Sequence, residues 1–354
     1  MLYDERRQER IFAVMEVPSR VLGQFKTSHS AGPCACPSPE ESAEWWNLIL
    51  KERASIEDDL VPSAYMREMD QGLYTGLLGA IVHFDCDPER GRISSRGMPL
   101  VSTWEEFKRL RQHCDLEWAI RYSQMLQAFF RKSEGYFGIS HLICVNGLNM
   151  VVDVFGAARA YLELRDRPEE VHEAMEFAHH VNTWVQDIFF ESIPLLEGGT
   201  CSNLASWRPG REISEGIDAF HMTSSEDFTQ WGIAPLSRMI SRYDGGILHL
   251  HGNGHHLIEA LCDVPGVRAV ALFDDGGVSP SFERLPQLKK QFGDMPLIVF
   301  ADYDEFSRAL KKGTLPGGVL YRVMGVPDAD RANHLMDEVR HYRARMLAYE
   351  KISL

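Results

Sequence analysis

Four short runs of sequence decide the fold: GILHLH (residues 246–251), VRAVALF (267–273), PLIVFA (296–301) and GVLYRVM (318–324). Each run is rich in aliphatic, β-branched or aromatic residues and has the length of a buried strand. The longer segments between and after them carry apolar residues at three- and four-residue spacing and predict helices at 255–262, 283–291, 304–312 and 328–350. Strand followed by helix, repeated at this spacing, predicts parallel strands joined by right-handed crossovers.

The same alternation extends upstream to about residue 135. It predicts strands at 137–145 and 217–223, and helices at 157–164, 168–191 and 227–243. Before residue 135 the pattern is mostly helical, with predicted helices at 40–53, 103–113 and 115–132. We therefore expect the N-terminal third to supply the first elements of the fold together with a helical cover.

Two architectures fit repeated strand and helix units: an open doubly wound sheet and a (β/α)8 TIM barrel. None of the predicted strands is followed by GxGxxG, which argues against a dinucleotide-binding sheet. Instead, polar side chains follow nearly every predicted strand, as in a barrel whose active site collects residues from several strand ends. We predict an α/β chain that forms one domain of 354 residues, with a helical N-terminal extension at 1–56 and a (β/α)8 TIM barrel at 57–345.

The charge balance excludes some classes of partner. The chain has 51 Asp and Glu against 37 Lys and Arg, a formal net charge of −14, which argues against binding to nucleic acid or to an anionic membrane surface. No run of about 20 apolar residues is present, and the first ten residues, MLYDERRQER, are charged, so we expect a cytoplasmic protein. The seven cysteines are scattered and odd in number, which predicts reduced thiols.

Residues 247–256, ILHLHGNGHH, are the most informative segment for function. Side chains at i and i+2 of a strand point to the same face, so His249 and His251 are expected to lie about 7 Å apart, as metal ligands or as an acid and base pair. A third ligand would be needed, and the sequence does not single one out. The candidates are Cys201, Glu226, Asp227 and Asp274.

A second segment, HMTSSEDF (221–228), joins a predicted strand to a predicted helix. Ser224 can cap this helix, and Glu226 and Asp227 suit the positive end of its dipole. The functional alternative places one of the carboxylates on the rim as a proton donor, proton acceptor or ligand, with Ser224 contacting the substrate.

The remaining candidates also follow predicted strands. Asn146 and Asn149 could bind a polar substrate, although both are also ordinary turn formers. Arg322 lies within the last predicted strand, and because a buried strand seldom holds an unpaired guanidinium, it is expected to meet a carboxylate of the chain or of a substrate. Two further polar residues complete the set of substrate-binding candidates, Asn253 and Asp302.

From about residue 57 to 345 the chain resembles the uroporphyrinogen decarboxylase superfamily, which includes porphyrin-pathway decarboxylases and zinc-dependent methyltransferases that serve corrinoid proteins and thiols. The resemblance implies a (β/α)8 barrel with its site at the carboxyl ends of the strands. The matching segments are DDLVP (58–62), NMVVDVFGAARAYLELRDRPEEVHEAM (149–175), SSEDF (224–228) with Pro235 after it, HLHGNGHHLIEAL (249–261) and VPDADRAN (326–333).

The chain departs from the decarboxylases of this superfamily at two places. Their arginine-rich N-terminal stretch binds the propionates of the substrate, whereas residues 17–30, VPSRVLGQFKTSHS, contain only Arg20 and Lys26 as basic side chains other than His29. Their histidine on the last strand is replaced here by Val323 or Met324. Both differences argue against true uroporphyrinogen decarboxylation.

The methyltransferases of the superfamily carry His-x-Cys where this chain has His249-Leu250-His251, and a cysteine on the last strand. The resemblance therefore implies a methyltransferase that moves a methyl group from a small methylated substrate to a corrinoid protein or a thiol, with Zn²⁺ held by His249, His251 and Cys201 or Glu226. A neutral histidine pair favours Lewis-acid chemistry over thiolate activation. Relatives are often dimers, so a homodimer is also implied.

Two alternatives remain open from the residues. The first is a metal-independent decarboxylase of a small aromatic or tetrapyrrole carboxylic acid, in which Arg322 binds the carboxylate and Asp227 or Asp274 stabilises the protonated ring. The second is a barrel without catalytic activity that binds a ligand, which the missing cysteines favour.

Overall fold

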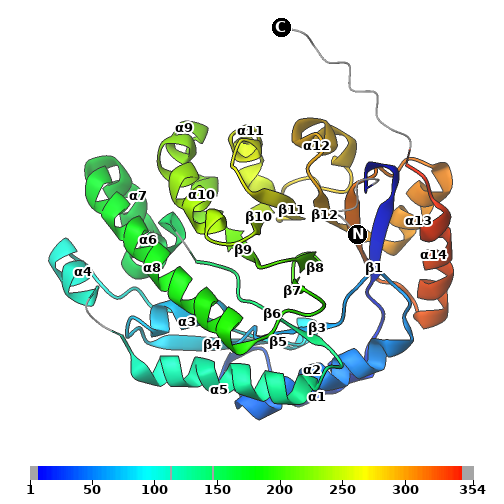
Figure 1. Cartoon of the computed structure of the whole chain (residues 1–354), viewed down its shortest axis with the longest axis horizontal. Helices are drawn as coiled ribbons and strands as arrows, with labels where there is room; N and C mark the ends of the chain where they lie inside the picture. Colours follow the sequence, from blue (N-terminus) through cyan, green and yellow to red (C-terminus); the bar gives the residue numbers. More distant parts are fainter. Residues whose placement is uncertain (1–6, 112–113, 146, 345–354) are drawn as a thin grey trace, which may run out of the picture.

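The computed structural model describes residues 7–111, 114–145 and 147–344, and shows a mixed α/β chain around a parallel sheet of six strands (Figure 1). The strand order is β1-β13-β12-β11-β10-β9, and every adjacent pair runs parallel. The strand bounds are β1 (Ile11–Met15), β9 (Glu212–Gly216), β10 (Gly245–His251), β11 (Val267–Phe273), β12 (Leu297–Asp302) and β13 (Val319–Met324).

Helices connect these strands and cover the outer face of the sheet (Figure 1). They are α10 (Ile233–Ser241), α11 (Ile258–Cys262), α12 (Leu285–Phe292), α13 (Tyr303–Lys312) and α14 (Ala329–His341). Because strand side chains alternate between faces, Leu248 and Leu250 of β10 join the core shared with these helices, whereas Ile247 joins a separate cluster on the inner face with Leu320. The inner face is therefore the one on which a site between strands can form.

Two smaller sheets complete the fold. One has the order β3-β6-β7-β8, and the other is antiparallel with the order β2-β4-β5. Their bounds are β2 (Gly32–Cys34), β3 (Ser63–Tyr65), β4 (Val82–Asp87), β5 (Arg92–Gly97), β6 (Gly138–Ser140), β7 (Gly199–Ser202) and β8 (Ser206–Pro209).

The remaining helices lie along the first two thirds of the chain. They are α1 (Arg20–Ser28), α2 (Pro39–Glu52), α3 (Asp70–Gly76), α4 (Trp104–Leu110), α5 (Leu116–Ser133), α6 (Leu148–Phe155), α7 (Ala157–Asp166), α8 (Pro168–Ser192) and α9 (Ser225–Asp227). Within the described ranges, no helix combines the length and the apolar character that crossing a bilayer requires.

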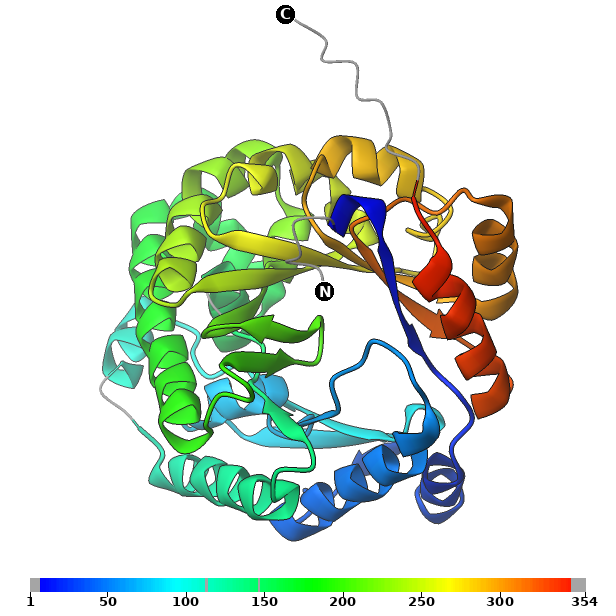
Figure 2. The same cartoon turned by 45° about the vertical axis from the view of Figure 1, so that its right-hand side comes forward.

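A few hydrogen bonds connect the two edges of the six-stranded sheet with residues that flank the strands of the four-stranded sheet. At one edge Cys144, which follows β6, forms a parallel bridge with Glu215 of β9. At the other edge the Asp59 N–H, shortly before β3, donates to the Ala13 carbonyl of β1 at 3.0 Å. Figure 2 shows these strands around a common centre with helices outside. The ladders among the described residues do not close into one ring, so the closed barrel that the sequence predicted is not shown.

The strands predicted at 246–251, 267–273, 296–301 and 318–324 are confirmed as β10, β11, β12 and β13. The predicted strand at 217–223 is wrong, because residues 218–222 form the 3-10 helix η4 (Asp218–Met222) and the strand precedes it as β9. The polar sequence of β9, EISEG, is buried in a strand because Glu212 pairs with Arg208 and Ser214 bonds to His141. Apolar alternation alone favoured the wrong segment.

The N-terminal third was also predicted incompletely. The run IFAVM forms β1, with all five residues buried, and places this segment inside the six-stranded sheet rather than in a helical extension. The antiparallel sheet β2-β4-β5 was likewise not predicted. At the other end of the chain α14 ends at His341, earlier than the predicted helix to residue 350, part of which lies outside the described residues.

Candidate metal centre

Strand β10 presents His249 and His251 on the inner face of the six-stranded sheet, near its carboxyl end. Their ring centroids are 4.5 Å apart, which confirms that the two side chains share a face. Phe273, at the end of the neighbouring strand β11, packs against His249 with a centroid separation of 4.2 Å. The histidine pair therefore lies beside an aromatic wall.

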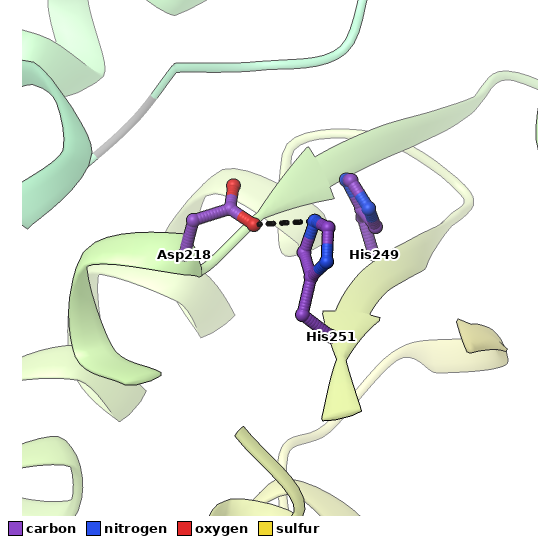
Figure 3. A group of neighbouring side chains, drawn as sticks. All are labelled: Asp218, His249 and His251. Carbon is purple, nitrogen blue, oxygen red and sulfur yellow. Dashed lines mark ion pairs between the residues drawn. The ribbon is translucent and has the colours of Figure 1, made fainter. Parts of the chain in front are cut away.

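Asp218 completes the group. It opens η4, the 3-10 helix that follows β9, and η4 lies beside β10 (Figure 3). One potential ligand atom from each of Asp218, His249 and His251 lies within 4.8 Å of the others. The sequence had proposed other third ligands, so the carboxylate of Asp218 is a site residue that sequence reasoning missed.

Asp275 fixes the orientation of one histidine. Its Oδ1 lies 2.8 Å from Nδ1 of His251, so Nδ1 carries the proton and Nε2, which lies 3.5 Å from Oδ1 of Asp218, keeps its lone pair. Burial raises the pKa of Asp275, but the hydrogen bonds from His251 and from the backbone of Asn253 and Gly252 outweigh it, and the pKa falls below its usual range. Asp275 is therefore ionised near neutral pH and holds the ring in a ligating tautomer.

Buried polar atoms in this group lack partners. Among the described residues, Nε2 of His249, Nε2 of His221 and Oδ1 of Asp218 have no hydrogen-bond partner. Burial lowers the pKa of His221 and of His249, which keeps these two rings neutral near pH 7. Neutral imidazole and carboxylate are zinc ligands, and a catalytic zinc site has three protein ligands and one open position. The two imidazoles of His249 and His251 and the carboxylate of Asp218, with buried donor atoms that lack partners, therefore fit a zinc ion.

Asn149 of α6 positions the carboxylate. Its Nδ2 donates to the carbonyl of Gly216 at 3.1 Å and to Oδ2 of Asp218 at 3.4 Å, and its Oδ1 accepts from the N–H of Ala219 at 2.9 Å. This residue was proposed to bind substrate, and the structure places it against the start of η4. One turn further along α6, burial and then the charge of Asp218 raise the pKa of Asp153 to about 7.

The other predicted carboxylates are not part of the group of Asp218, His249 and His251. Ser224 and Asp227 form the capping box of α9, and Asp227 also pairs with Arg165 at 2.9 Å, while Glu226 is exposed. Asp274 accepts the N–H of Ser281 at 2.7 Å. The capping interpretation of segment 221–228 is therefore confirmed.

Four further candidates are not part of the group of Asp218, His249 and His251, or fall outside the described residues. Asp302 caps α13, and Asn253 is exposed. Cys201 is buried on β7, where its sulfur lies beside Gly138, and burial raises its pKa to about 12, so it does not join the group of Asp218. Asn146 falls outside the described residues.

Arg322 of β13 confirms the expectation that it meets a carboxylate. It donates to Oε1 of Glu16 at 3.1 Å and to the carbonyl of Asn203 at 2.9 Å. A row of aromatic rings connects it to the histidines: Arg322 lies 5.8 Å from the ring of Phe300, which is 5.0 Å from Phe273. The guanidinium and the histidine pair therefore belong to one inner face.

A cavity of about 420 Å³ lies beside Arg322. Sequence reasoning missed its other cationic residues, because they come from the segment 53–92, where neither strands nor a site was predicted. The two arginines in Arg90-Gly91-Arg92 were the sequence signal that could have indicated a cationic site. The charged residues that line it are Arg53, Arg67, Arg90, Arg92, Arg322, Glu16 and Asp70.

The comparisons with known proteins support the fold. No protein-family model and no curated protein sequence matches this chain, so the resemblance to the uroporphyrinogen decarboxylase superfamily is not confirmed. Eight solved chains match by structure. One is a methyltransferase from Methanosarcina mazei, with a TM-score of 0.56 and 12% sequence identity over 91% of this chain and 98% of that chain. This chain therefore has the fold of a known methyltransferase.

Proposed function

We propose that this protein is a zinc-dependent methyltransferase that moves a methyl group from a small methylated substrate to a corrinoid protein or a thiol. The observation that carries the proposal is the group of Asp218, His249 and His251, whose ligand atoms lie within 4.8 Å of one another. A likeness in fold to a methyltransferase from Methanosarcina mazei supports the reaction class. We further propose that the described strands belong to an interrupted (β/α)8 barrel, as the contacts at both sheet edges suggest.

The residues around the site have separate tasks in this reaction. Nε2 of His249, Nε2 of His251 and a carboxylate oxygen of Asp218 would hold the metal, and Asp275 keeps the proton of His251 on Nδ1. When bound, Zn²⁺ would polarise the leaving heteroatom or activate the accepting thiol. Phe273 packs against His249 and would help to exclude water from that side of the site, which protects the methyl group from hydrolysis. Asp153, with a pKa raised to about 7, can hold a proton near Asp218.

Metal content tests the proposal directly. The purified protein should contain about one zinc per chain by elemental analysis, and His249→Ala and Asp218→Asn should each lose most of it, since three ligands become two. Asp263→Asn is the matched control, because Asp263 is exposed and follows α11 outside the site. Less than about a tenth of an equivalent in the wild type, with no further loss in His249→Ala, would remove the metal mechanism.

One observation favours a second candidate, the metal-independent decarboxylase. Asp70 lines the arginine-rich cavity and accepts a 2.7 Å hydrogen bond from the hydroxyl of Tyr65, and burial raises its pKa to about 6. A carboxyl group that titrates near neutrality can protonate a carbon from which CO₂ departs. The zinc measurement separates the two candidates.

A further inference from the structure

The arginine-rich cavity carries positive charge in a chain whose net charge is −14. Five arginines and two acidic residues line it. Three carboxylates pair with four of these arginines. Arg53 pairs with Asp58 and Arg322 with Glu16, whereas Arg90 and Arg92 share Asp87, at 3.6 and 3.8 Å. A cavity that gathers one sign of charge between low-dielectric walls attracts ions of the opposite sign.

Arg67 is the least compensated of these cations. Its guanidinium lies over the neighbouring rings of Trp45 and Trp46, at 4.9 and 4.6 Å from their centroids, and donates to the carbonyl of Gly91 at 3.0 Å. Among the described residues, no carboxylate oxygen lies within 4 Å of it. Burial lowers the pKa of Arg67 to about 10, although the nearby charge of Glu68 raises it, so Arg67 stays charged at neutral pH.

A buried charge in a folded protein normally has a partner, and an arginine fork matches a carboxylate in geometry. Nε of Arg322 is also buried without a hydrogen-bond partner among the described residues. The rest of the lining combines polar side chains with apolar ones, among them Trp46, Leu60, Leu204 and Leu320. A ligand that satisfies both features has an anionic end and an apolar body.

The cavity and the candidate metal centre lie on the same inner face of the six-stranded sheet. Arg322 is a lining residue, and the contacts from Arg322 through Phe300 and Phe273 reach His249 along the inner face. A molecule anchored at the arginines can therefore extend toward the histidines. A volume of about 420 Å³ is in the range of small-molecule sites.

We infer that this cavity binds the carboxylate of a small organic acid through Arg67, Arg92 and Arg322. This inference rests on the proposed function only in naming that acid as the methylated substrate. Three observations carry it: the excess of arginines over paired carboxylates, the guanidinium of Arg67 that forms no ion pair among the described residues, and the apolar side chains in the lining. Inorganic phosphate shares the anionic chemistry but lacks an apolar body, so it fits the cavity less well.

Calorimetric titration of the full chain tests the inference with a pair of matched probes, 4-methoxybenzoate and 4-methoxybenzamide. The two have the same shape and differ in charge. The acid should bind at least tenfold more tightly than the amide and more tightly than inorganic phosphate. Equal binding of acid and amide, or tighter binding of phosphate, would overturn the inference.

Variants locate the binding site. Arg67→Gln should weaken binding of the acid at least tenfold and leave the amide unchanged, and Arg92→Gln should weaken the acid at least threefold. Arg92 is half exposed, at 45% of its side chain, so this variant keeps the test open if Arg67→Gln fails to fold. Arg96→Gln, on the same strand and exposed, is the control and should bind as the wild type does. Equal loss in the control would overturn the assignment.

The same titration on His249→Ala separates this inference from the proposed function. We expect the acid to bind that variant within about threefold of the wild type, because the arginines are unaltered. If the wild type holds no zinc but still prefers the acid through Arg67, the proposed function fails and the inference stands. If zinc binds but acid and amide are not distinguished, the inference fails alone.

Discussion

The hydrogen bond between Asp275 and His251 decides which nitrogen of the ring faces the site. With Nδ1 donating to the carboxylate at 2.8 Å, Nε2 is left to ligate beside Asp218. Carboxylate partners of this kind orient metal-binding histidines and raise their basicity. Asp275 therefore contributes to metal binding although it is not one of the three proposed ligands.

Replacing Asp275 should therefore weaken zinc binding without abolishing it. We expect Asp275→Asn to lower zinc affinity about 10- to 100-fold, measured by competition with a chromogenic chelator. Asp274→Asn changes the neighbouring carboxylate, which accepts the N–H of Ser281, and should leave the affinity within about twofold. Unchanged affinity in Asp275→Asn would show that this hydrogen bond does not prepare the site.

His141 makes the stability of the protein depend on pH. It is fully buried, with Nδ1 at 3.1 Å from the carbonyl of Cys201 and Nε2 at 3.0 Å from Oγ of Ser214. The carbonyl requires a proton on Nδ1, so Nε2 accepts from the hydroxyl and the ring is neutral. Burial lowers the pKa to about 4. The unfolded chain therefore takes up this proton at a higher pH than the folded one.

Because the folded pKa lies below the unfolded value, stability is lost as pH falls from about 6.5 toward 4. Between pH 7 and pH 5 the free energy of unfolding should fall by about 2 kcal/mol more in the wild type than in His141→Gln. Urea unfolding at the two pH values measures this difference. Parallel losses in the two proteins would contradict the assignment.

At the scale of elements, α6 holds η4 against the end of β9 through one side chain. Asn149 makes three of the hydrogen bonds that fix the start of η4, and with it Asp218. The N-terminus of η4 has no side-chain cap of its own. The position of the carboxylate thus depends on the packing of α6 against η4 rather than on η4 itself.

We expect Asn149→Ala to lower zinc affinity about tenfold and the free energy of unfolding by about 1–2 kcal/mol, because buried backbone groups lose their partners. Asn149→Asp keeps one acceptor for the N–H of Ala219 but places a second negative charge near Asp218, so it should raise the pKa of Asp153 further. Chelator competition and denaturant unfolding measure the two effects of Asn149→Ala. An unchanged zinc affinity would show that Asp218 is placed independently of α6.

The sequence predicted correctly the elements whose buried faces are made of apolar residues in a regular pattern. Strands such as β11 are runs of aliphatic residues covered on both faces, and Arg322 was placed correctly because a guanidinium on such a strand needs a partner. Asp218 was missed because it opens η4, whose short run of apolar and polar residues resembles a strand in sequence. Arg67 was missed because its role comes from contacts between distant segments, Trp45, Trp46 and the cavity, that no local pattern records.

At the scale of the whole molecule, the candidate metal centre joins two neighbouring connections of the six-stranded sheet. Asp218 follows β9, whereas His249 and His251 belong to β10. A bound ion therefore links segments that unfolding would separate, and a ligand that binds only the folded chain stabilises it by mass action.

Zinc at about 100 times its dissociation constant should stabilise the protein by roughly 2.7 kcal/mol and raise its melting temperature by about 4 °C. The double variant Asp218→Asn, His249→Ala should show no such shift, although its seven cysteines are retained. Differential scanning fluorimetry with and without zinc measures both. An equal shift in the double variant would place zinc at another site.

We propose that Asp218, His249 and His251 hold one zinc ion at the carboxyl end of β10. A crystal grown with zinc and measured on both sides of the zinc absorption edge tests it most directly. We expect one anomalous peak at about 2.0–2.2 Å from Nε2 of each histidine and from a carboxylate oxygen of Asp218. A peak coordinated by other residues, or none between these side chains in zinc-saturated crystals, would contradict it.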